Sequence, residues 1–144
     1  YLSDEADEVK KKVMSMFTDP NHLRVQDPGR VEGNPVFIYL DAFSRPEHFA
    51  EFLPEYQNLD ELKAHYQRGG LGDVKVKKFL NNVMQAELGP IRERRKMWEQ
   101  RTEDVFDILK AGTEVAREKA AATLHDVRSS MRINYFEDQD FLNQ

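Results

Sequence analysis

The sequence predicts an all-α protein, a bundle of helices, and two observations lead to this prediction. Apolar residues recur at spacings of three and four along most of the chain, which is the period of an amphipathic helix. Residues that typically begin or end helices stand at the edges of these stretches. Apolar residues make up 40% and charged residues 33% of the 144 positions, which suits a folded domain and excludes a disordered chain.

The first periodic stretch follows Ser3, a good N-cap, and we expect it to close at Asp19-Pro20. Several turn signals follow, so the chain up to Gly33 is predicted to be a loop. Asn34-Pro35 marks the next start, because a proline is tolerated at the first helical position. The composition of residues 36–40 would also suit a buried strand, but this start signal favours a helix.

Two shorter helices are expected next. One begins after Pro46. The other begins at Asn58, where Glu61 completes a pattern that resembles a capping box. The double glycine Gly69-Gly70 is predicted to end that second helix.

The longest apolar stripe runs over residues 76–88. Gly89-Pro90 is predicted to kink or break this helix, with a second arm continuing over residues 91–100. Beyond it, Thr102 is expected to cap a short helix that ends at Gly112. Thr113 is expected to cap the last helix, whose alanines imply close approach to a neighbouring helix; they are Ala116 and Ala120.

The net charge is −5, yet the chain holds a basic segment. Residues 71–101 carry eight Lys/Arg against four Asp/Glu. If two arms meet at Gly89-Pro90, their outer faces form one concave basic surface that suits the phosphates of RNA. The alternative is an ordinary solvated helix face. Trp98 is either a stacking residue beside the arginines or a core anchor.

No other pattern indicates a self-sufficient active site. The chain has no cysteine, and its four histidines lack metal-ligand spacing, so we expect no metal site and no catalytic residue. The glycine-rich turn before Lys75 could hold a nucleotide phosphate, although a helix stop explains it better. No stretch approaches a membrane span. The chain begins without methionine, and we expect it to be a piece of a longer protein.

Read as a whole, residues 3–136 resemble the C-terminal half of bacterial tryptophanyl-tRNA synthetases. The motifs that carry the resemblance occur in family order: Phe17-Thr18-Asp19, Arg24 and Asp27, Asn34, the glycines and Lys75 within residues 66–75, Pro90-Ile91 with Glu93-Arg94, and Gly112, Ala116, Ala120, Thr123-Leu124 and Val127. The family's H-x-G-H and Lys-Met-Ser-Lys-Ser motifs are absent from this sequence.

The resemblance implies a helical C-terminal domain of a class I aminoacyl-tRNA synthetase, over residues 1–136, with a flexible acidic tail at 137–144. It implies a parent ligase that uses ATP and Mg²⁺ to join L-tryptophan to tRNA(Trp), a cytoplasmic location and a homodimer. The chain alone is expected to be inactive and to need no cofactor.

The expected RNA-binding residues are Lys75, Arg92, Arg94 and Arg95. Lys75 and Arg94 match family positions, whereas Arg92 and Arg95 follow from the basic segment. The alternative function is a non-catalytic helical protein-interaction module. A third hypothesis is that the turn from Gly69 to Lys75 binds nucleotide phosphates.

Overall fold

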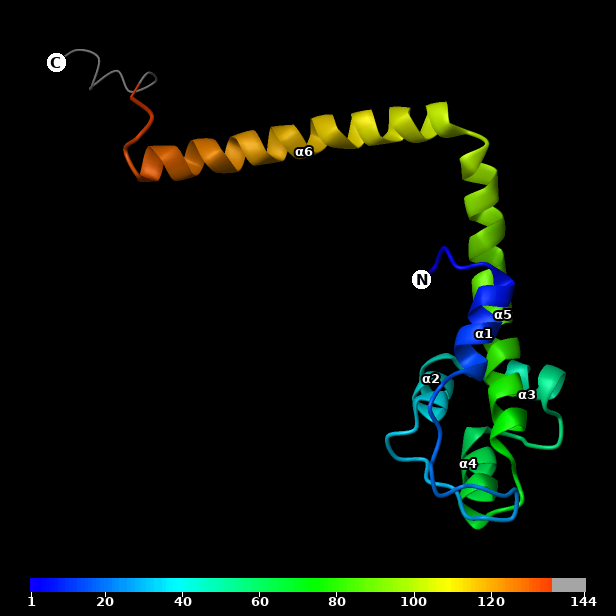
Figure 1. Ribbon diagram of the computed structural model, residues 1–144. Helices are drawn as coiled ribbons and strands as arrows, with labels where there is room; N and C mark the ends of the chain where they lie inside the picture. Colours follow the sequence, from blue (N-terminus) through cyan, green and yellow to red (C-terminus); the bar gives the residue numbers. More distant parts are fainter. Residues whose placement is uncertain (136–144) are drawn as a thin grey trace. The chain divides into compact units, whose positions relative to one another are not determined.

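In the computed structural model, residues 1–135 are described, and they form six α-helices and no strand. The helices are α1 (Ala6–Met14), α2 (Pro35–Phe43), α3 (Pro46–Phe52), α4 (Leu59–Arg68), α5 (Asp73–Glu99) and α6 (Thr102–Ser130) (Figure 1). The prediction of an all-α fold is confirmed. Within the described residues, no helix combines the length and the apolar character needed to span a bilayer.

The chain divides into two compact units, residues 1–96 and residues 97–144. The first holds α1 to α4 and most of α5, and the second holds α6. The predicted acidic tail at 137–144 lies outside the described residues, and the predicted domain over 1–136 stays a prediction. None of the residues of α6 is buried. Ala116 and Ala120 are exposed, so the neighbouring helix expected beside them also stays a prediction.

The hydrophobic core of the first unit is built around α5, which the shorter helices surround in Figure 1. Aromatic pairs connect the helices, with Phe49 of α3 at 4.7 Å from Phe79 of α5 and Phe37 of α2 at 4.9 Å from Tyr66 of α4, between ring centroids. Helix α5 contributes the largest share of the core: Val76, Phe79, Leu80, Val83, Met84 and Leu88.

The predicted starts of α2, α3 and α4 are confirmed. The side chain of Asn34 accepts a hydrogen bond from the Val36 amide, and Pro35 is the first helical residue. Asn58 accepts in the same way from the Glu61 amide, and Gly69 follows the last residue of α4 with φ 87°. The residues 36–40 are therefore helical, because the cap and the proline decide what their composition left open.

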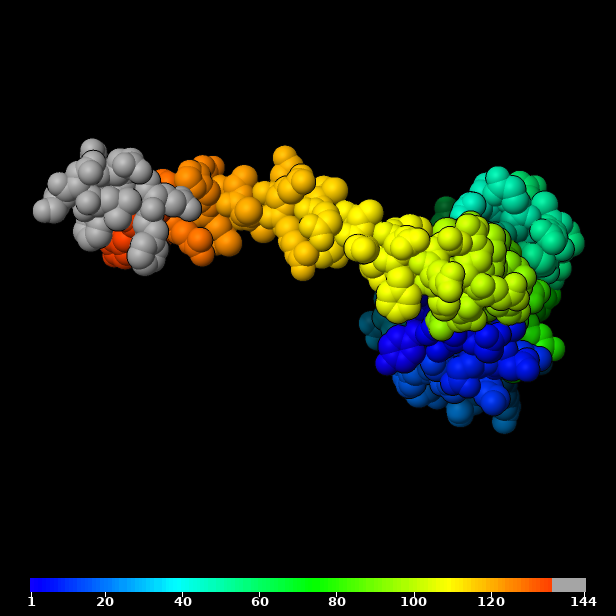
Figure 2. Space-filling view, turned by 90° about the horizontal axis from the view of Figure 1, so that it is seen from above, coloured from blue at the N-terminus to red at the C-terminus, as the bar shows by residue number. Residues whose placement is uncertain are grey.

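The predicted bounds of α1 are wrong. The helix begins at Ala6, with Glu5 at the N-cap position and no side-chain cap, so Ser3 does not cap it. Asp4 pairs with Lys12 and with the N-terminal ammonium. It ends at Met14 rather than at Asp19-Pro20. Lys77 of α5 donates to the carbonyl oxygens of Met14 and Met16, and these bonds satisfy acceptors that a longer helix would use itself. In the space-filling view, α1 forms part of the surface of this unit (Figure 2).

Two predicted helix breaks do not occur. Helix α5 continues through Pro90, which removes one backbone donor while the helix on both sides keeps its hydrogen bonds. Helix α6 likewise runs through Gly112 and Thr113. The Thr113 hydroxyl donates to the Leu109 carbonyl at 2.7 Å, so this side chain bonds within the helix instead of capping a new one.

Candidate nucleic-acid interface

The predicted RNA-binding residues all lie on α5, but the structure spreads them along it. Because a helix rises about 1.5 Å per residue, the Cα atoms of Lys75 and Arg94 stand roughly 29 Å apart along the axis. Helix α5 is not broken at Pro90, so the two expected arms are parts of one helix, and the concave surface between them stays a prediction. The basic residues therefore belong to two places, the first turn of α5 and the stretch after Pro90.

In the first turn of α5, the side chain of Lys75 already has partners within the protein. Its ammonium is hydrogen-bonded to the carboxylate of Glu55 and lies 5.9 Å from the centre of the Tyr56 ring. The hydrogen bond from Lys75 lowers the pKa of Glu55, and the same bond raises the pKa of Lys75. Both side chains are about half exposed, so a phosphate must compete with Glu55 for this lysine.

Arg92 and Lys77 contact the protein itself. Arg92 is half-buried, and its Nη2 donates to the Gln85 side chain at 2.5 Å, while its buried Nη1 has no hydrogen-bond partner among residues 1–135. Lys77 donates to the end of α1, as described above. Lys77 therefore joins α5 to the end of α1, whereas the Arg92 contact lies within α5, and both cations are only partly exposed.

The remaining arginines after Pro90 face solvent. Arg94 and Arg95 are both exposed, and Lys96 pairs with Glu93 at 3.3 Å. Adjacent arginines on a helix point in directions about 100° apart, so these two guanidinium groups can reach two successive phosphates of a nucleic-acid strand. Among the predicted residues, Arg94 and Arg95 are exposed, as Lys75 is, while Arg92 is half-buried.

Trp98 lies in the second unit and is half-buried rather than part of the core. The guanidinium of Arg101 lies 5.1 Å from the centre of its ring and also bonds to Asp104 at 2.6 Å. Within the described residues, Trp98 therefore makes a cation–π contact with Arg101.

The glycine-rich turn between α4 and α5 is used for packing. Gly69 and Gly70 both have positive φ, and the Gly70 amide donates to the Val25 carbonyl at 2.7 Å. A Cβ added to Gly69 would lie 2.3 Å from the Gln26 carbonyl oxygen, so only glycine fits there. Asp73 adds a negative charge at the start of α5. The turn therefore does not fit a nucleotide phosphate.

The carboxylate of Asp73 is the centre of a partly buried polar cluster. It accepts hydrogen bonds from Tyr66 at 2.6 Å and from Thr18 at 2.9 Å, and its Oδ1 lies 3.1 Å from Nδ1 of His22. Burial raises the pKa of Asp73, but the hydrogen bonds from Tyr66, Thr18 and His22 outweigh it and hold the pKa below its usual value. Burial and the neighbouring carboxylate raise the pKa of Tyr66. The cluster fixes the loop at residues 18–22 against α4 and α5.

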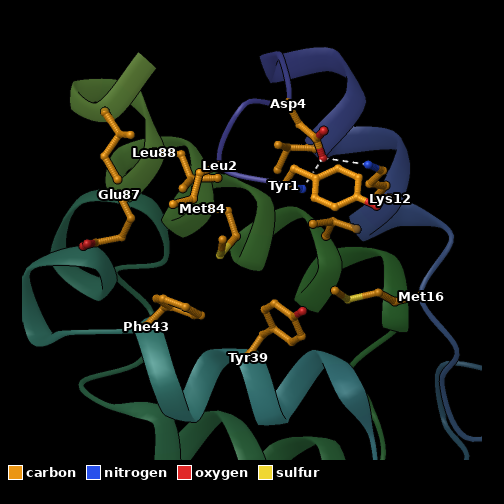
Figure 3. Close-up of a pocket in the computed structure, with 13 residues that line it drawn as sticks. Tyr1, Leu2, Asp4, Lys12, Met16, Tyr39, Phe43, Met84, Glu87 and Leu88 are labelled. Atoms are coloured by element: carbon orange, nitrogen blue, oxygen red, sulfur yellow. Dashed lines mark hydrogen bonds and ion pairs between the residues drawn. The ribbon is translucent and has the colours of Figure 1, made fainter. Parts of the chain in front are cut away.

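An apolar groove of about 400 Å³ lies between α1, α2 and α5. Tyr39 and Phe43 point into it from α2, and Met84 and Leu88 point into it from α5 (Figure 3). The Asp4–Lys12 ion pair stands at its rim, and the hydrogen bond from Lys12 lowers the pKa of Asp4. Its lining is mostly apolar, with Asp4, Lys12 and Glu87 as the charged residues.

Sequence reasoning missed the cluster around Asp73 and a second cavity, between residues 17–21 and residues 30–34. Both depend on contacts across more than ten positions, such as the bond from the Arg30 amide to Asp19 at 2.9 Å. The only local signal is the concentration of Asn, Asp, Pro and His in a segment predicted to be a loop. Within the described residues, no group of three or more metal-ligating side chains comes together.

Comparison with known proteins gives a consistent result. No family model matches the chain. It is 58% identical over 136 residues to the tryptophan–tRNA ligase of Clostridium longisporum and 54% identical over 136 residues to that of Streptococcus mutans. These matches cover 94% of the chain but only 37% and 38% of the relatives, so the chain spans well under half of their length, in their C-terminal part.

A solved structure has the same fold. The tryptophanyl-tRNA synthetase of Campylobacter jejuni superposes with a TM-score of 0.67 at 22% identity, over 90% of this chain and 38% of that one. The resemblance described from the sequence is confirmed: the chain is similar to the C-terminal part of tryptophan–tRNA ligases. The alternative function, a protein-interaction module, gains no support from these relatives.

Proposed function

We propose that this chain is the tRNA-binding C-terminal region of a tryptophan–tRNA ligase. The observation that carries the proposal is the 58% identity to one such ligase over 94% of the chain. The solvent-facing arginines of α5 support it, because guanidinium groups bind phosphates in a bidentate manner.

The four proposed RNA-binding residues differ in what they can contribute. Arg94 and Arg95 are the main proposed phosphate contacts, since both are exposed. Lys75 binds a phosphate once its ion pair with Glu55 has broken. Arg92 is half-buried and held by Gln85, so its role is to position the helix surface beside the RNA rather than to neutralise a phosphate.

The rest of the activity belongs to the parent enzyme. That enzyme activates L-tryptophan with ATP and Mg²⁺ and transfers it to tRNA(Trp), in the cytoplasm and as a homodimer. The proposal assigns ATP and Mg²⁺ to the parent enzyme; within residues 1–135 the glycine turn makes backbone contacts, and no group of three or more metal-ligating side chains comes together. This chain supplies tRNA contacts, and the chain by itself forms no aminoacyl-adenylate.

A titration of the chain with transcribed tRNA(Trp) over a range of salt concentrations tests the proposal. Each phosphate neutralised adds about −0.7 to the slope of log affinity against log salt on a single strand and about −0.9 on a duplex. We expect weak binding with a slope that reflects a few phosphates. A chain that binds no tRNA at low salt, or binds it without salt dependence, is not the proposed region.

A further inference from the structure

The loop between α3 and α4 places a carboxylate against one of the proposed phosphate contacts. Glu55 lies in this loop, 20 positions before Lys75 in the sequence, and its carboxylate accepts a hydrogen bond from the Lys75 ammonium. Within residues 1–135, Glu55 is the carboxylate with which the structure pairs this lysine. Lys75 therefore has an anionic partner before any nucleic acid arrives.

The position of Glu55 is fixed by its neighbour Tyr56. The Tyr56 amide donates to the Leu53 carbonyl at 3.1 Å, and the Tyr56 side chain is buried. Its hydroxyl lies 2.7 Å from Nδ1 of His65 in α4. Because the fold holds Glu55 close to Lys75, the carboxylate meets the ammonium at a far higher effective concentration than a dissolved anion does.

Tyr56 also contacts the lysine directly. The Lys75 ammonium lies 5.9 Å from the centre of the Tyr56 ring, within the range of a cation–π contact. This contact does not involve the Glu55 carboxylate, so the ammonium can stay beside the ring when the carboxylate leaves. A phosphate oxygen can then take the place of the carboxylate oxygen, because both are anionic hydrogen-bond acceptors.

The ion pair is weak enough for a phosphate to replace it. The side chains of Lys75 and Glu55 are 49% and 48% exposed, so solvent reaches both. The hydrogen bond from Lys75 holds the pKa of Glu55 below its usual value, so the carboxylate stays charged near neutral pH. An exposed ion pair changes an equilibrium constant by about fivefold at most, which a ligand with several phosphates overcomes.

We propose that Glu55 is an internal competitor of RNA phosphates: it occupies Lys75 in the free chain, lowers the affinity of the chain for RNA, and is displaced when a phosphate binds. This inference rests on the proposed function, because it takes Lys75 as one of the tRNA contacts. Glu55 itself touches no phosphate and acts through Lys75. Removing its charge should therefore strengthen RNA binding, whereas removing a cation weakens it.

The test measures the affinity for tRNA(Trp), over a range of salt concentrations, of the unchanged chain, of Glu55→Gln, and of Glu51→Gln as the matched control. Glu51 is exposed on α3, and within residues 1–135 the structure gives its side chain no ion pair or hydrogen bond. Each variant removes one negative charge from the same part of the chain. Glu55→Gln should bind about two- to fivefold more tightly than the unchanged chain, and Glu51→Gln should gain less.

A double variant then shows whether Glu55 acts through Lys75. In a chain that already carries Lys75→Ala, the change Glu55→Gln should give no further gain in affinity. In the Glu55→Gln chain, Lys75→Ala should flatten the slope of log affinity against log salt by about 0.7 to 0.9, which is one phosphate contact. A change in folding alone would not move this slope, and the urea midpoints of all variants should stay close together because the pair is exposed.

The proposal is overturned if Glu55→Gln binds tRNA no more tightly than the unchanged chain, if Glu51→Gln gains as much, or if the gain persists in the double variant. In each of these cases, salt-dependent binding of tRNA by the unchanged chain leaves the proposed function standing. If neither the unchanged chain nor Glu55→Gln binds tRNA, both proposals are rejected.

Discussion

The hydroxyl of Tyr66 donates a hydrogen bond to Asp73 at 2.6 Å, and this bond joins the last turn of α4 to the first turn of α5. The two residues are separated by the double-glycine turn, whose positive φ angles bring the helix ends together. Tyr66 is also one of the most buried side chains of the first unit. The pair thus connects the hydrophobic core to the loop that Asp73 holds through Thr18 and His22.

Replacing Asp73 by asparagine should destabilise the first unit. The amide keeps the shape but loses the negative charge that strengthens the bonds from Tyr66 and Thr18. Because hydrogen bonds to a charged group contribute about 1.5–3 kcal/mol each to the free energy of unfolding, we expect a loss of about 2 kcal/mol near neutral pH. Urea unfolding followed by circular dichroism measures it. Thr18→Val, which removes one donor, should cost less, and an equal or larger cost would contradict the central place of Asp73.

The same carboxylate should make stability depend on acid pH. The pKa of Asp73 is lower in the folded chain than the usual value of an aspartate, because Tyr66, Thr18 and His22 hydrogen-bond to its carboxylate. A group whose folded pKa is depressed stabilises the fold above its unfolded pKa, and this contribution is lost as the pH falls through the folded pKa. The urea midpoint of the unchanged chain should therefore fall more steeply below about pH 4 than that of Asp73→Asn. If the urea midpoints of the two proteins fall equally as the pH is lowered, Asp73 is not the cause of the acid sensitivity.

Two glycines of the first unit should respond in opposite ways to alanine. A Cβ at Gly29 would lie 2.3 Å from the buried ring of Tyr66, so Gly29→Ala should cost about 1–3 kcal/mol of unfolding free energy. A Cβ at Gly89 meets nothing within 4 Å in the middle of α5. Gly89→Ala should therefore stabilise the helix by about 0.5–1 kcal/mol. Thermal unfolding distinguishes these outcomes, and a destabilised Gly89→Ala would favour the hinge at Gly89-Pro90 that the continuous helix argues against.

The local signals of the sequence predict the helices where a single cap decides, as at Asn34 and Asn58. They wrongly suggest a helix break at Gly89-Pro90 and a new helix start at Thr113. A long helix tolerates one missing backbone donor, and the Thr113 hydroxyl bonds within its own helix. They also mislead about α1, whose end depends on Lys77, a residue more than 60 positions away.

The same limit applies to the candidate site, where local patterns locate the basic residues but not their partners. Charge counts along the sequence locate the basic helix, and the exposure of Arg94 and Arg95 agrees with that expectation. The counts cannot show that Lys75 is paired with Glu55 or that Arg92 turns back to Gln85, since those partners come from tertiary packing and helix geometry. The cavity between residues 17–21 and residues 30–34 depends on the hydrogen bond from the Arg30 amide to Asp19, which local sequence patterns do not predict.

The salt dependence of tRNA binding in a double arginine variant tests the central claim most directly. Arg94→Ala with Arg95→Ala should weaken binding of tRNA(Trp) and flatten the slope of log affinity against log salt by roughly one to two units. The variant should unfold at nearly the same urea concentration as the unchanged chain, because exposed arginines contribute little to stability. Lys10→Ala with Lys11→Ala, a matched pair of exposed cations on α1, should change the slope less. An unchanged slope in the arginine variant, or a larger change in the lysine variant, would contradict the assignment of this surface to tRNA.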